Sequence, residues 1–296
     1  HIADALLRDN HEVVVVDNLS TGCRANVPAG TVFYQASILD RRIRHIFKIE
    51  KPEIVFHEAA QTVVTRSVRE PVFDARTNIL GSLNLLDACV HFGVGKIIYA
   101  SSCAAYGTPR YIPLDEAHPL DAMSPYGVSK QTVERYLKTC RDIHGLEYCA
   151  LRYSNVYGPR QNTAGEAGVV AIFTRQMLSH QRPRIYGDGS KTRSYVYVGD
   201  VVRANLLAME RGQGIFNIGT GEETTDRRMF DLISLYCGYD EQPEYVPERP
   251  GEIRRMLLDC RSARQELGWE PWTGFEEGLE RTVAAYRGAV YAEAVG

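Results

Sequence analysis

The sequence lacks several features that would assign it to a class at once. No apolar run approaches the roughly 18 to 20 residues that a membrane span requires, and the longest are short β-like runs such as 13–16. Lys and Arg total 34 against 37 Asp and Glu, a formal net charge of −3. That balance gives no basic excess to attract nucleic acid or anionic lipid. We therefore expect neither a membrane protein nor a nucleic-acid-binding protein.

Cysteine and histidine are present without the spacings that indicate disulfides or metals. The seven cysteines are odd in number and show no C-x-x-C spacing. This argues against a disulfide framework and a zinc ribbon, and favours a reducing cytoplasm. The eight histidines show no H-x-x-x-H or H-E-x-x-H pattern, so we expect no metal site. Residues 1–10 have a helical pattern and none of the shape of a signal peptide.

What is present is an alternation of strand-like and helical segments. Runs rich in β-branched residues lie at 11–17, 31–34, 53–57, 96–102 and 147–156, and helical periodicity lies at 41–50, 72–92 and 126–144. This order predicts an α/β fold of right-handed βαβ units with a parallel sheet. After about residue 157 Gly and Pro interrupt the pattern, which predicts a smaller, irregular α/β region for substrate. A strand over 214–219 could return to the first sheet.

Asp17 ends the buried-type run VVVVD. In dinucleotide-binding folds an acid at such a strand end hydrogen-bonds the adenine ribose and repels a 2′-phosphate, which would favour NAD over NADP. A turn or cap residue is the plainer alternative. The glycine fingerprint should precede this acid by roughly 20 residues, and that count falls before His1. Either the sequence lacks the first strand and glycine loop or the loop does not exist; the helical pattern of 1–10 favours the first.

SPYGVSK (124–130) is the strongest local signal. Ser124 can cap a helix that Pro125 begins, which places Tyr126 and Lys130 one turn apart on the same face. A tyrosine needs roughly 4 kcal/mol of preference for the phenolate to act as a base near neutrality, and a neighbouring cation acts in that direction. A strand ending at Ser102 could bring a hydroxyl to the same edge of the sheet. Without that context, a Tyr and a Lys at Y-x-x-x-K spacing on a helix are usually solvent-exposed residues with no catalytic role.

Motifs from near residue 1 to about residue 285 stand in the order of one known family. They are VVVVDNLSTG (13–22), FHEAAQ (56–61), NILGSLNLLDAC (78–89), YASSCAAYG (99–107), SPYGVSK (124–130), LRYSNVYGPRQ (151–161), GEAGVVAIF (165–173), YGDGSKTRSYVYVGD (186–200), FNIGTGEE (216–223) and RPGEI (249–253). With them the chain resembles the extended short-chain dehydrogenase/reductase family, in its NAD-dependent nucleotide-sugar epimerase/dehydratase group. The resemblance implies a doubly wound Rossmann-type sheet and 4-epimerisation of a UDP-sugar, UDP-glucose or UDP-galactose, with NAD as cofactor.

The resemblance also implies roles for individual residues. Tyr126 would be the catalytic base and acid, with Lys130 as its electrostatic partner and Ser102 at the family's catalytic Ser/Thr position. The cofactor would be held by Asp17, Asn18, Ser37, Ile38, Ala59, Ala60, Gln61, Asn78, Tyr126, Lys130 and Tyr153. The substrate would be held by Ser102, Tyr126, Asn155, Val170, Tyr186, Arg193, Arg249, Glu252 and Met256. Tyr186 would stack on the base, and the two arginines would converge on the diphosphate.

Departures from the family pattern bear on the reaction. Cys103 and Ala104 stand where dehydratases and decarboxylases of the family carry acidic residues, which disfavours the loss of water or CO₂. For Cys103 core packing is favoured over a nucleophilic role. Ser37, Ser154 and Ser194 stand where Asp, Phe and Asp are common. Met256, at the position beside the sugar, does not settle hexose against N-acetylhexosamine.

The organisation expected from both lines of reasoning is a two-part chain. Its NAD-binding domain would comprise residues 1–157 plus about 195–222, and its nucleotide-sugar-binding region 158–194 plus 223–296. Helices 72–92 and 126–144 carry more apolar surface than one sheet face needs, and in the family such helices pair, so we expect a homodimer. Two alternatives stay open: an NAD-dependent dehydratase or decarboxylase of a related nucleotide sugar, and a non-catalytic relic or interaction protein of the same fold.

Overall fold

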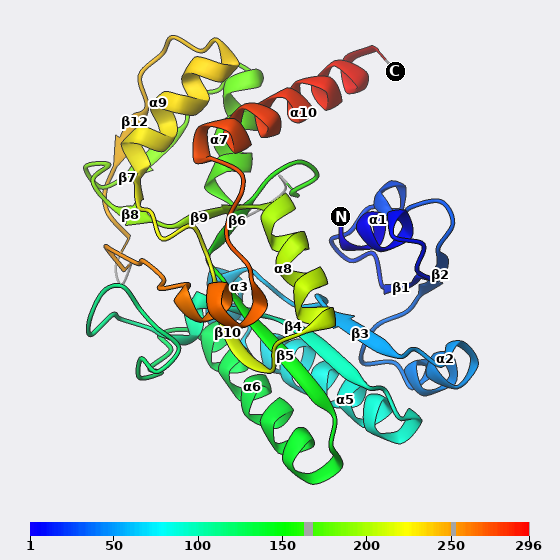
Figure 1. Ribbon diagram of the computed structural model, residues 1–296. Coiled ribbons are helices and arrows are strands. Elements are labelled where there is room, and N and C mark those ends of the chain that lie inside the picture. The colour runs from blue at the N-terminus through cyan, green and yellow to red at the C-terminus, as the bar shows by residue number, and fades with distance from the viewer. Residues whose placement is uncertain (163–167, 250–252, 296) are drawn as a thin grey trace.

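A four-stranded parallel sheet forms the centre of the protein (Figure 1). The structure is a computed structural model that describes residues 1–162, 168–249 and 253–295, with side chains to residue 288. The strand order is β10-β5-β4-β3, and the strands are β3 (Ile54–His57), β4 (Lys96–Ser102), β5 (Glu147–Tyr153) and β10 (Gly214–Ile218). A second parallel pair, β1 (Val14–Asp17) with β2 (Val32–Gln35), forms a separate sheet. All carboxyl ends of the four central strands therefore meet at one edge.

Helices cover both faces of the central sheet (Figure 1). One face carries α2 (Arg42–Glu50), α5 (Gly81–Phe92) and α6 (Pro125–His144), and the other carries α1 (Ile2–Arg8) and α8 (Val198–Glu210). Successive residues of a strand point to opposite faces, so β4 contributes Ile97 and Tyr99 to the core beneath α5 and α6, and Ile98 to the core beneath α8. Two apolar cores thus fix this sheet from both sides.

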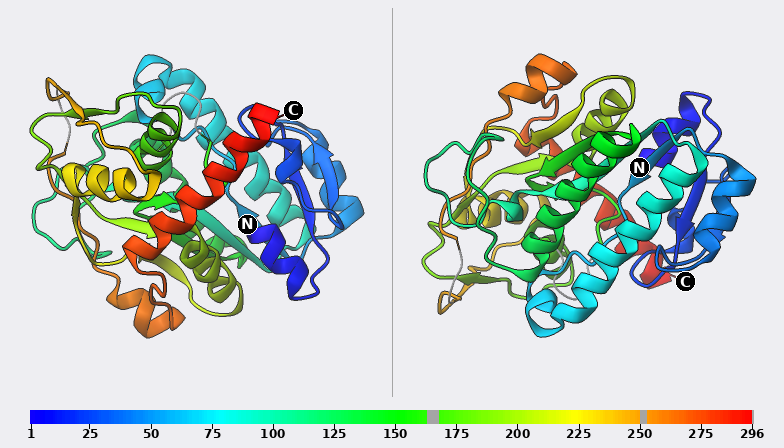
Figure 2. Two further views of the ribbon diagram at one scale, coloured as in Figure 1. Left: turned by 90° about the horizontal axis from the view of Figure 1, so that it is seen from above. Right: turned by 90° about the horizontal axis from the view of Figure 1, so that it is seen from below.

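The chain between β3 and α5 is helical but irregular. It comprises α3 (Val64–Arg69), α4 (Pro71–Ala75) and a π-helical turn (Arg76–Leu80) that leads directly into α5. Short 3₁₀ turns lie at Arg24–Asn26 and Cys103–Ala105, and a second π-helical turn lies at Ala263–Leu267. Seen from below, α5 and α6 lie next to each other on the outside of the molecule (Figure 2, right).

The second half of the chain builds a smaller region from short strands and helices (Figure 1). Its two-stranded sheets pair β6 (Asn155–Tyr157) with β9 (Tyr195–Tyr197), β7 (Arg184–Tyr186) with β12 (Glu244–Val246), and β8 (Thr192–Arg193) with β11 (Thr224–Thr225). The helices are α7 (Val169–Leu178), α9 (Asp226–Cys237) and α10 (Phe275–Val295). They pack around a third core that includes Phe173, Met229 and Phe230.

The predicted α/β fold with a parallel sheet is confirmed, and so is the return of 214–219, which pairs as β10 with β5. The single strand predicted over 147–156 is wrong. The chain breaks at Ser154, where the backbone N–H of Ser154 bonds the carbonyl of Ile218 in the central sheet and that of Asn155 bonds Ser194 in the smaller region. The chain leaves one sheet for another at this point. The proposed domain boundaries stay a prediction.

Candidate active site

The first turn of α6 is anchored by hydroxyls from two segments. Ser124 Oγ accepts a hydrogen bond from the backbone N–H of Gly127 (3.1 Å), as expected of an N-cap. Ser67 Oγ, from α3, accepts one from the N–H of Tyr126 (3.1 Å). Ser67 is fully buried. These bonds satisfy donors that a helix start leaves without partners, and they fix Tyr126 at the start of α6.

Gly127 lets α6 approach the end of β4 closely. A Cβ added at this position would lie 2.4 Å from the carbonyl oxygen of Ala104, so a side chain would force the helix away. Ser102, the last residue of β4, hydrogen-bonds Tyr126. The register pairs Ser102 with Tyr153 on the neighbouring strand β5. Three of the predicted site residues therefore meet at the carboxyl edge of the sheet, where open α/β folds bind ligands.

Burial governs the protonation of the two central groups. It raises the pKa of Tyr126 to about 12, and the hydrogen bond with Ser102 opposes that rise. Burial lowers the pKa of Lys130 to about 8, against the attraction of the carboxylates of Glu58 and Asp74. At neutral pH the pair is a phenol beside an ammonium group. The positions suit a proton that is held at the phenol oxygen and can move through the Ser102 hydroxyl.

Lys130 is fixed by contacts on several sides. Its Nζ donates to the backbone carbonyl of Ala100 on β4 at 2.6 Å. It lies 4.8 Å from the centre of the Tyr99 ring and 5.8 Å from that of the Tyr126 ring, distances at which an ammonium group is attracted to the aromatic face. The one-turn spacing predicted for Tyr126 and Lys130 is thus realised with both on the inner side of α6.

Asp17 and its turn form the candidate nucleotide-binding end of β1. The backbone N–H of Leu19 donates to Asp17 Oδ1 (2.6 Å), and that of Ser20 donates to Asn18 Oδ1 (3.0 Å). A Cβ on Gly22 would lie 3.4 Å from both carboxylate oxygens of Asp17. The turn therefore wraps the carboxylate closely at the strand end, and its two oxygens are acceptors that suit the two hydroxyls of an adenine ribose.

The other predicted cofactor residues lie along the same edge or just behind it. Ala59 and Ala60 follow β3 with small, partly or fully exposed side chains. Ser37 Oγ caps its own turn at the N–H of Leu39 (3.2 Å), and Ile38 packs against Gly81 of α5. The small side chains at this edge of the sheet are compatible with the predicted cofactor, and the individual contacts stay predictions.

Gln61 and Asn78 are buried in a polar network of their own. The N–H of Gln61 donates to Asn78 Oδ1 (2.8 Å), and Asn78 Nδ2 donates to the carbonyl of Gln61 (2.9 Å) and to Ser129 Oγ (3.1 Å). Gln61 Nε2 donates to the buried carboxylate of Asp74 at 2.8 Å. Their side chains are committed to protein partners, so they hold the turn after β3 against α4 and α6. A direct cofactor contact from either stays a prediction.

A small pocket beside Ser102 gathers three of the nine predicted substrate residues, Asn155, Arg193 and Met256. Its lining comprises Cys103, Ser154, Asn155, Arg193, Ser194, Met256 and Leu258. Burial raises the pKa of Cys103 to about 11, so its sulfur is a protonated thiol and not a nucleophile at neutral pH. Arg193 is the cation of this pocket, and its Nη1 also donates to the carbonyl of Thr192 (2.7 Å).

Tyr186 and Arg249 form a second pair further along the smaller region. The Arg249 guanidinium carbon lies 3.9 Å from the centre of the Tyr186 ring, so the arginine covers one face of this ring, and the stacking of Tyr186 on a base stays a prediction. Val170 is buried in the third core, which leaves only its backbone near the start of α7 for a ligand. Glu252 lies outside the described residues.

Several residues that position the site were not predicted. Glu134 and Arg152 form a buried ion pair between α6 and β5, with an Arg152 Nη2 to Glu134 Oε2 distance of 2.6 Å. Ser101 donates to the same carboxylate at 2.6 Å. Glu134 stands four residues after Lys130, so the helical repeat that links Tyr126 and Lys130 could have pointed to it. Nothing in the sequence pattern marks Ser67.

Membrane-spanning helices and clustered metal ligands are both absent from the described residues. None of the helices in the ranges described is long and apolar enough to cross a membrane. Across those same ranges, the side chains of His, Cys, Asp and Glu nowhere gather in a group of three or more that could hold a metal ion.

Comparison with known proteins shows which family the chain is similar to. The sequence profile of the NAD dependent epimerase/dehydratase family matches residues 1–219. The UDP-glucose 4-epimerase of Thermotoga maritima, solved with UDP-glucose, is 48% identical with a TM-score of 0.96, covering 98% of this chain and 95% of that one. The UDP-glucose 4-epimerase of Thermus thermophilus, solved with NAD, is 42% identical with a TM-score of 0.93 and the same coverage of 98% and 95%.

A third structure has a different sugar in its name. The UDP-N-acetylglucosamine 4-epimerase of Methanobrevibacter ruminantium, in complex with UDP-N-acetylmuramic acid, is 36% identical with a TM-score of 0.93, covering 98% of this chain and 94% of that one. The expected Rossmann-type fold and the expected use of NAD are confirmed at the level of the family. With a profile match over most of its length and near-complete structural overlap, the chain belongs to the NAD dependent epimerase/dehydratase family.

Proposed function

We propose that this protein interconverts UDP-glucose and UDP-galactose by inverting the configuration at C4 of the sugar. The observation that carries the proposal is the hydrogen-bonded pair of Ser102 and Tyr126, set one turn from Lys130 beside a pocket whose described lining residues include no carboxylate. Ser102 is followed by Cys103 and Ala104, so the pocket has a proton carrier at one position and no second acid for elimination. This combination supports epimerisation over dehydration or decarboxylation.

The residues of this chain would handle the proton and the orientation of the sugar. Tyr126 takes the proton from the C4 hydroxyl as that carbon is oxidised, and returns it as the carbon is reduced from the opposite face. Ser102 bridges the sugar oxygen and the phenol, and the Lys130 cation favours the phenolate. Bound NAD supplies the acceptor and donor of hydride. The reaction has no net redox change.

Binding would divide between the two halves of the molecule. Asp17 would hold the adenine ribose, while Lys130 and Tyr153 would face the nicotinamide end. Arg193 and Arg249 would hold the diphosphate, because guanidinium groups match phosphate oxygens in pairs of hydrogen bonds. A diphosphate clamped in this way leaves the sugar free to turn over between oxidation and reduction, which inversion at C4 requires.

A UDP-N-acetylhexosamine is the second candidate substrate. It is favoured by the 36% identity to an enzyme with that substrate in its name, and by serine hydroxyls in the pocket at positions 154 and 194. The Ser154 hydroxyl is buried without a hydrogen-bond partner among the described residues. Polar atoms of this kind could accept an amide substituent, so the two sugars should be compared directly.

The test follows UDP-galactose by NMR in the presence of the purified protein and catalytic NAD⁺, with UDP-N-acetylglucosamine in parallel. UDP-glucose should form without net NADH. Tyr126→Phe should lower the rate by about 10²- to 10⁴-fold, the usual contribution of a general acid–base group. A 4-keto-6-deoxy or pentose product, or no turnover by a preparation that retains NAD, would contradict the proposal.

A further inference from the structure

Asn217, near the end of β10, has a fully buried side chain whose hydrogen-bonding groups are all used. Its Oδ1 accepts from the hydroxyl of Tyr106 (2.7 Å), and its Nδ2 donates to the carbonyls of Leu114 (3.0 Å) and Asp259 (3.1 Å). A rotated amide would set its oxygen against two carbonyl oxygens, so the partners fix its orientation. One side chain thus joins two parts of the chain that are distant from it in sequence, residues 106–114 and Asp259.

Both parts of the chain lead to the candidate active site. Tyr106 follows Ser102 by four residues. Leu114 lies in the long loop between β4 and α6, and Asp259 follows Leu258, which lines the sugar pocket with Met256. The loop and the C-terminal segment are also joined directly, since the N–H of Leu114 bonds the carbonyl of Leu257 (2.8 Å) and that of Asp259 bonds the carbonyl of Leu114 (2.7 Å).

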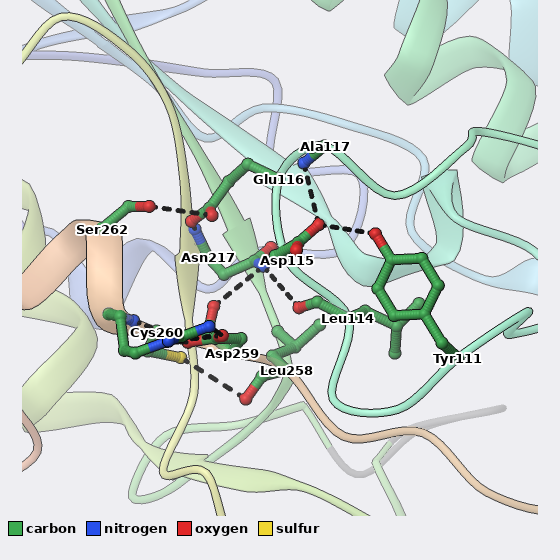
Figure 3. A network of polar contacts seen from close by, with 11 residues as sticks. Tyr111, Leu114, Asp115, Glu116, Ala117, Asn217, Leu258, Asp259, Cys260 and Ser262 are labelled. Atoms are coloured by element: carbon green, nitrogen blue, oxygen red, sulfur yellow. Dashed lines mark hydrogen bonds and ion pairs between the residues drawn. The ribbon is translucent and has the colours of Figure 1, made fainter.

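Glu116 closes this junction from the loop side (Figure 3). Its Oε1 accepts from the backbone N–H of Asn217 (2.8 Å), and its Oε2 accepts from Ser262 Oγ (3.0 Å). The figure shows Asn217 between the loop that carries Leu114 and the segment that carries Asp259. β10 is an edge strand of its sheet, so no further strand is available to accept the hydrogen bond of this N–H. The Glu116 carboxylate accepts it instead.

The junction continues to the catalytic helix. The Arg152 guanidinium carbon lies 4.6 Å from the centre of the Tyr106 ring. Arg152 in turn pairs with Glu134 of α6, and both are nearly fully buried. A chain of contacts therefore runs from α6, which carries Tyr126 and Lys130, through Tyr106 and Asn217, to the wall of the pocket formed by Met256 and Leu258.

We propose that Asn217 is a positioning residue that sets the Met256–Leu258 wall of the sugar pocket relative to Ser102 and Tyr126. The proposal rests on the proposed function, because it takes this pocket as the place where the sugar turns over. A displaced wall would hold the sugar less tightly and misalign its C4 with the proton carrier. The NAD-binding residues at the ends of β1 and β3 lie outside the junction and would be unaffected.

Two variants test this at different strengths. Asn217→Asp replaces both donors with an acceptor, and should lower kcat/KM for UDP-galactose by about tenfold to hundredfold, the cost of misplacing reacting groups by a fraction of an ångström to an ångström. Tyr106→Phe removes the hydroxyl that Asn217 Oδ1 accepts from. It should raise KM severalfold and so lower kcat/KM as well, by less than Asn217→Asp does. If Asn217→Asp does not fold, Tyr106→Phe carries the test.

The matched control is Tyr157→Phe. Tyr157 is equally buried, and its hydroxyl donates to the carbonyl of Phe275 (3.1 Å) in the core of the smaller region. It should lower the Tm as Tyr106→Phe does, with KM unchanged. All variants should retain the wild-type amount of NAD per chain. Equal KM values for Tyr106→Phe, Tyr157→Phe and wild type would show that Asn217 and its partners only stabilise the fold, and would overturn the proposal.

Calorimetric binding of UDP-glucose to the same variants separates this proposal from the proposed function. If the wild type binds UDP-glucose without converting it, the proposed function fails. The weaker binding expected for Tyr106→Phe, and not for Tyr157→Phe, then still decides the positioning role. A wild type that binds no UDP-sugar overturns both.

Discussion

The surroundings of Tyr126 shift the pKa of its phenol in two opposite directions. Burial raises the pKa of the phenol to about 12, away from the range of a base that works near neutrality. The hydrogen bond with Ser102 acts in the other direction, because it stabilises the charged form. The balance at this residue therefore depends on a hydroxyl that the adjacent strand delivers.

Replacing Ser102 by a residue without a hydroxyl should raise the pKa of Tyr126 and lower turnover at neutral pH. In Ser102→Ala the pKa of Tyr126 rises further, so turnover at neutral pH should fall by about tenfold to hundredfold, as expected for loss of a hydrogen bond to a charged group. The loss should shrink as the pH is raised toward the pKa of the phenol. Ser102→Thr keeps the hydroxyl and is the control. The pH–rate profiles of the three proteins check this, and identical profiles would exclude the role given to Ser102.

His57, at the end of β3, is buried as a neutral ring. Ser82 gives its hydroxyl proton to the carbonyl of Asn78, so His57 Nε2 donates to Ser82 Oγ at 2.7 Å and Nδ1 carries no proton. Among the described residues Nδ1 is buried without a partner. Burial and the nearby Lys130 cation lower the pKa of His57 to about 3.

This histidine should make the fold sensitive to mild acid. Its pKa is near 6.5 in the unfolded chain and about 3 in the folded one. Between these values the histidine is protonated in the unfolded state and neutral in the folded state. The free energy of unfolding should then fall by about 1 kcal/mol per pH unit as the pH drops below 6.5. Urea unfolding at several values between pH 6.5 and 5 measures the slope. His57→Gln should flatten it, and an unchanged slope would assign the acid sensitivity to other groups.

At the scale of elements, the approach of α6 to the end of β4 is what assembles the site. The helix begins at Pro125 under two hydroxyl caps, and Gly127 allows its first turn to touch the Ala104 carbonyl. Gly145 ends the same helix in a left-handed conformation, with φ of 74° and open space around it. Glycine is therefore required at position 127 by the close approach of the Ala104 carbonyl, and at position 145 by the positive φ that ends the helix.

Alanine at these positions should separate activity from stability. Gly127→Ala would place a Cβ 2.4 Å from a backbone oxygen, so the helix start must move and turnover should fall by about a hundredfold. Gly145→Ala should lower the free energy of unfolding by about 1 kcal/mol because of its positive φ, with little effect on turnover. Kinetics and urea unfolding of both variants provide the comparison. Full activity in Gly127→Ala would contradict the close approach of α6.

At the scale of the whole molecule, the parts that local pattern dictates were predictable and the long-range parts were not. Strand and helix alternation predicts the parallel sheet, and Y-x-x-x-K spacing predicts the pairing of Tyr126 with Lys130. The break at Ser154 was not predictable, because its cause is a pair of hydrogen bonds to Ile218 and Ser194. The role of Asn217 was not predictable for the same reason, because its partners come from distant parts of the chain.

An exposed apolar surface on α3, α4 and α6 supports the homodimer expected from the sequence. Val68, Val72, Tyr136 and Ile143 are exposed by 61%, 79%, 41% and 68%, and they belong to helices that pack against one another. Exposed apolar side chains on neighbouring helices are typical of interfaces between chains, so we predict that these helices contribute to the dimer contact. The surface lies on the outer side of the helix layer that carries Tyr126, so a partner there would brace α6.

Analytical ultracentrifugation tests this surface with a matched pair of variants. The wild type should sediment at twice the chain mass of 33.2 kDa. Val72→Glu would bury an unpaired carboxylate in the interface, at a cost of several kcal/mol, and should shift the equilibrium toward monomer. Leu235→Glu, at a side chain 72% exposed on α9, adds the same charge away from the surface and should leave the dimer intact. Equal sedimentation of the two variants would mean that any dimer uses another face. A carboxylate at position 72 that does not weaken the dimer cannot be buried in its interface.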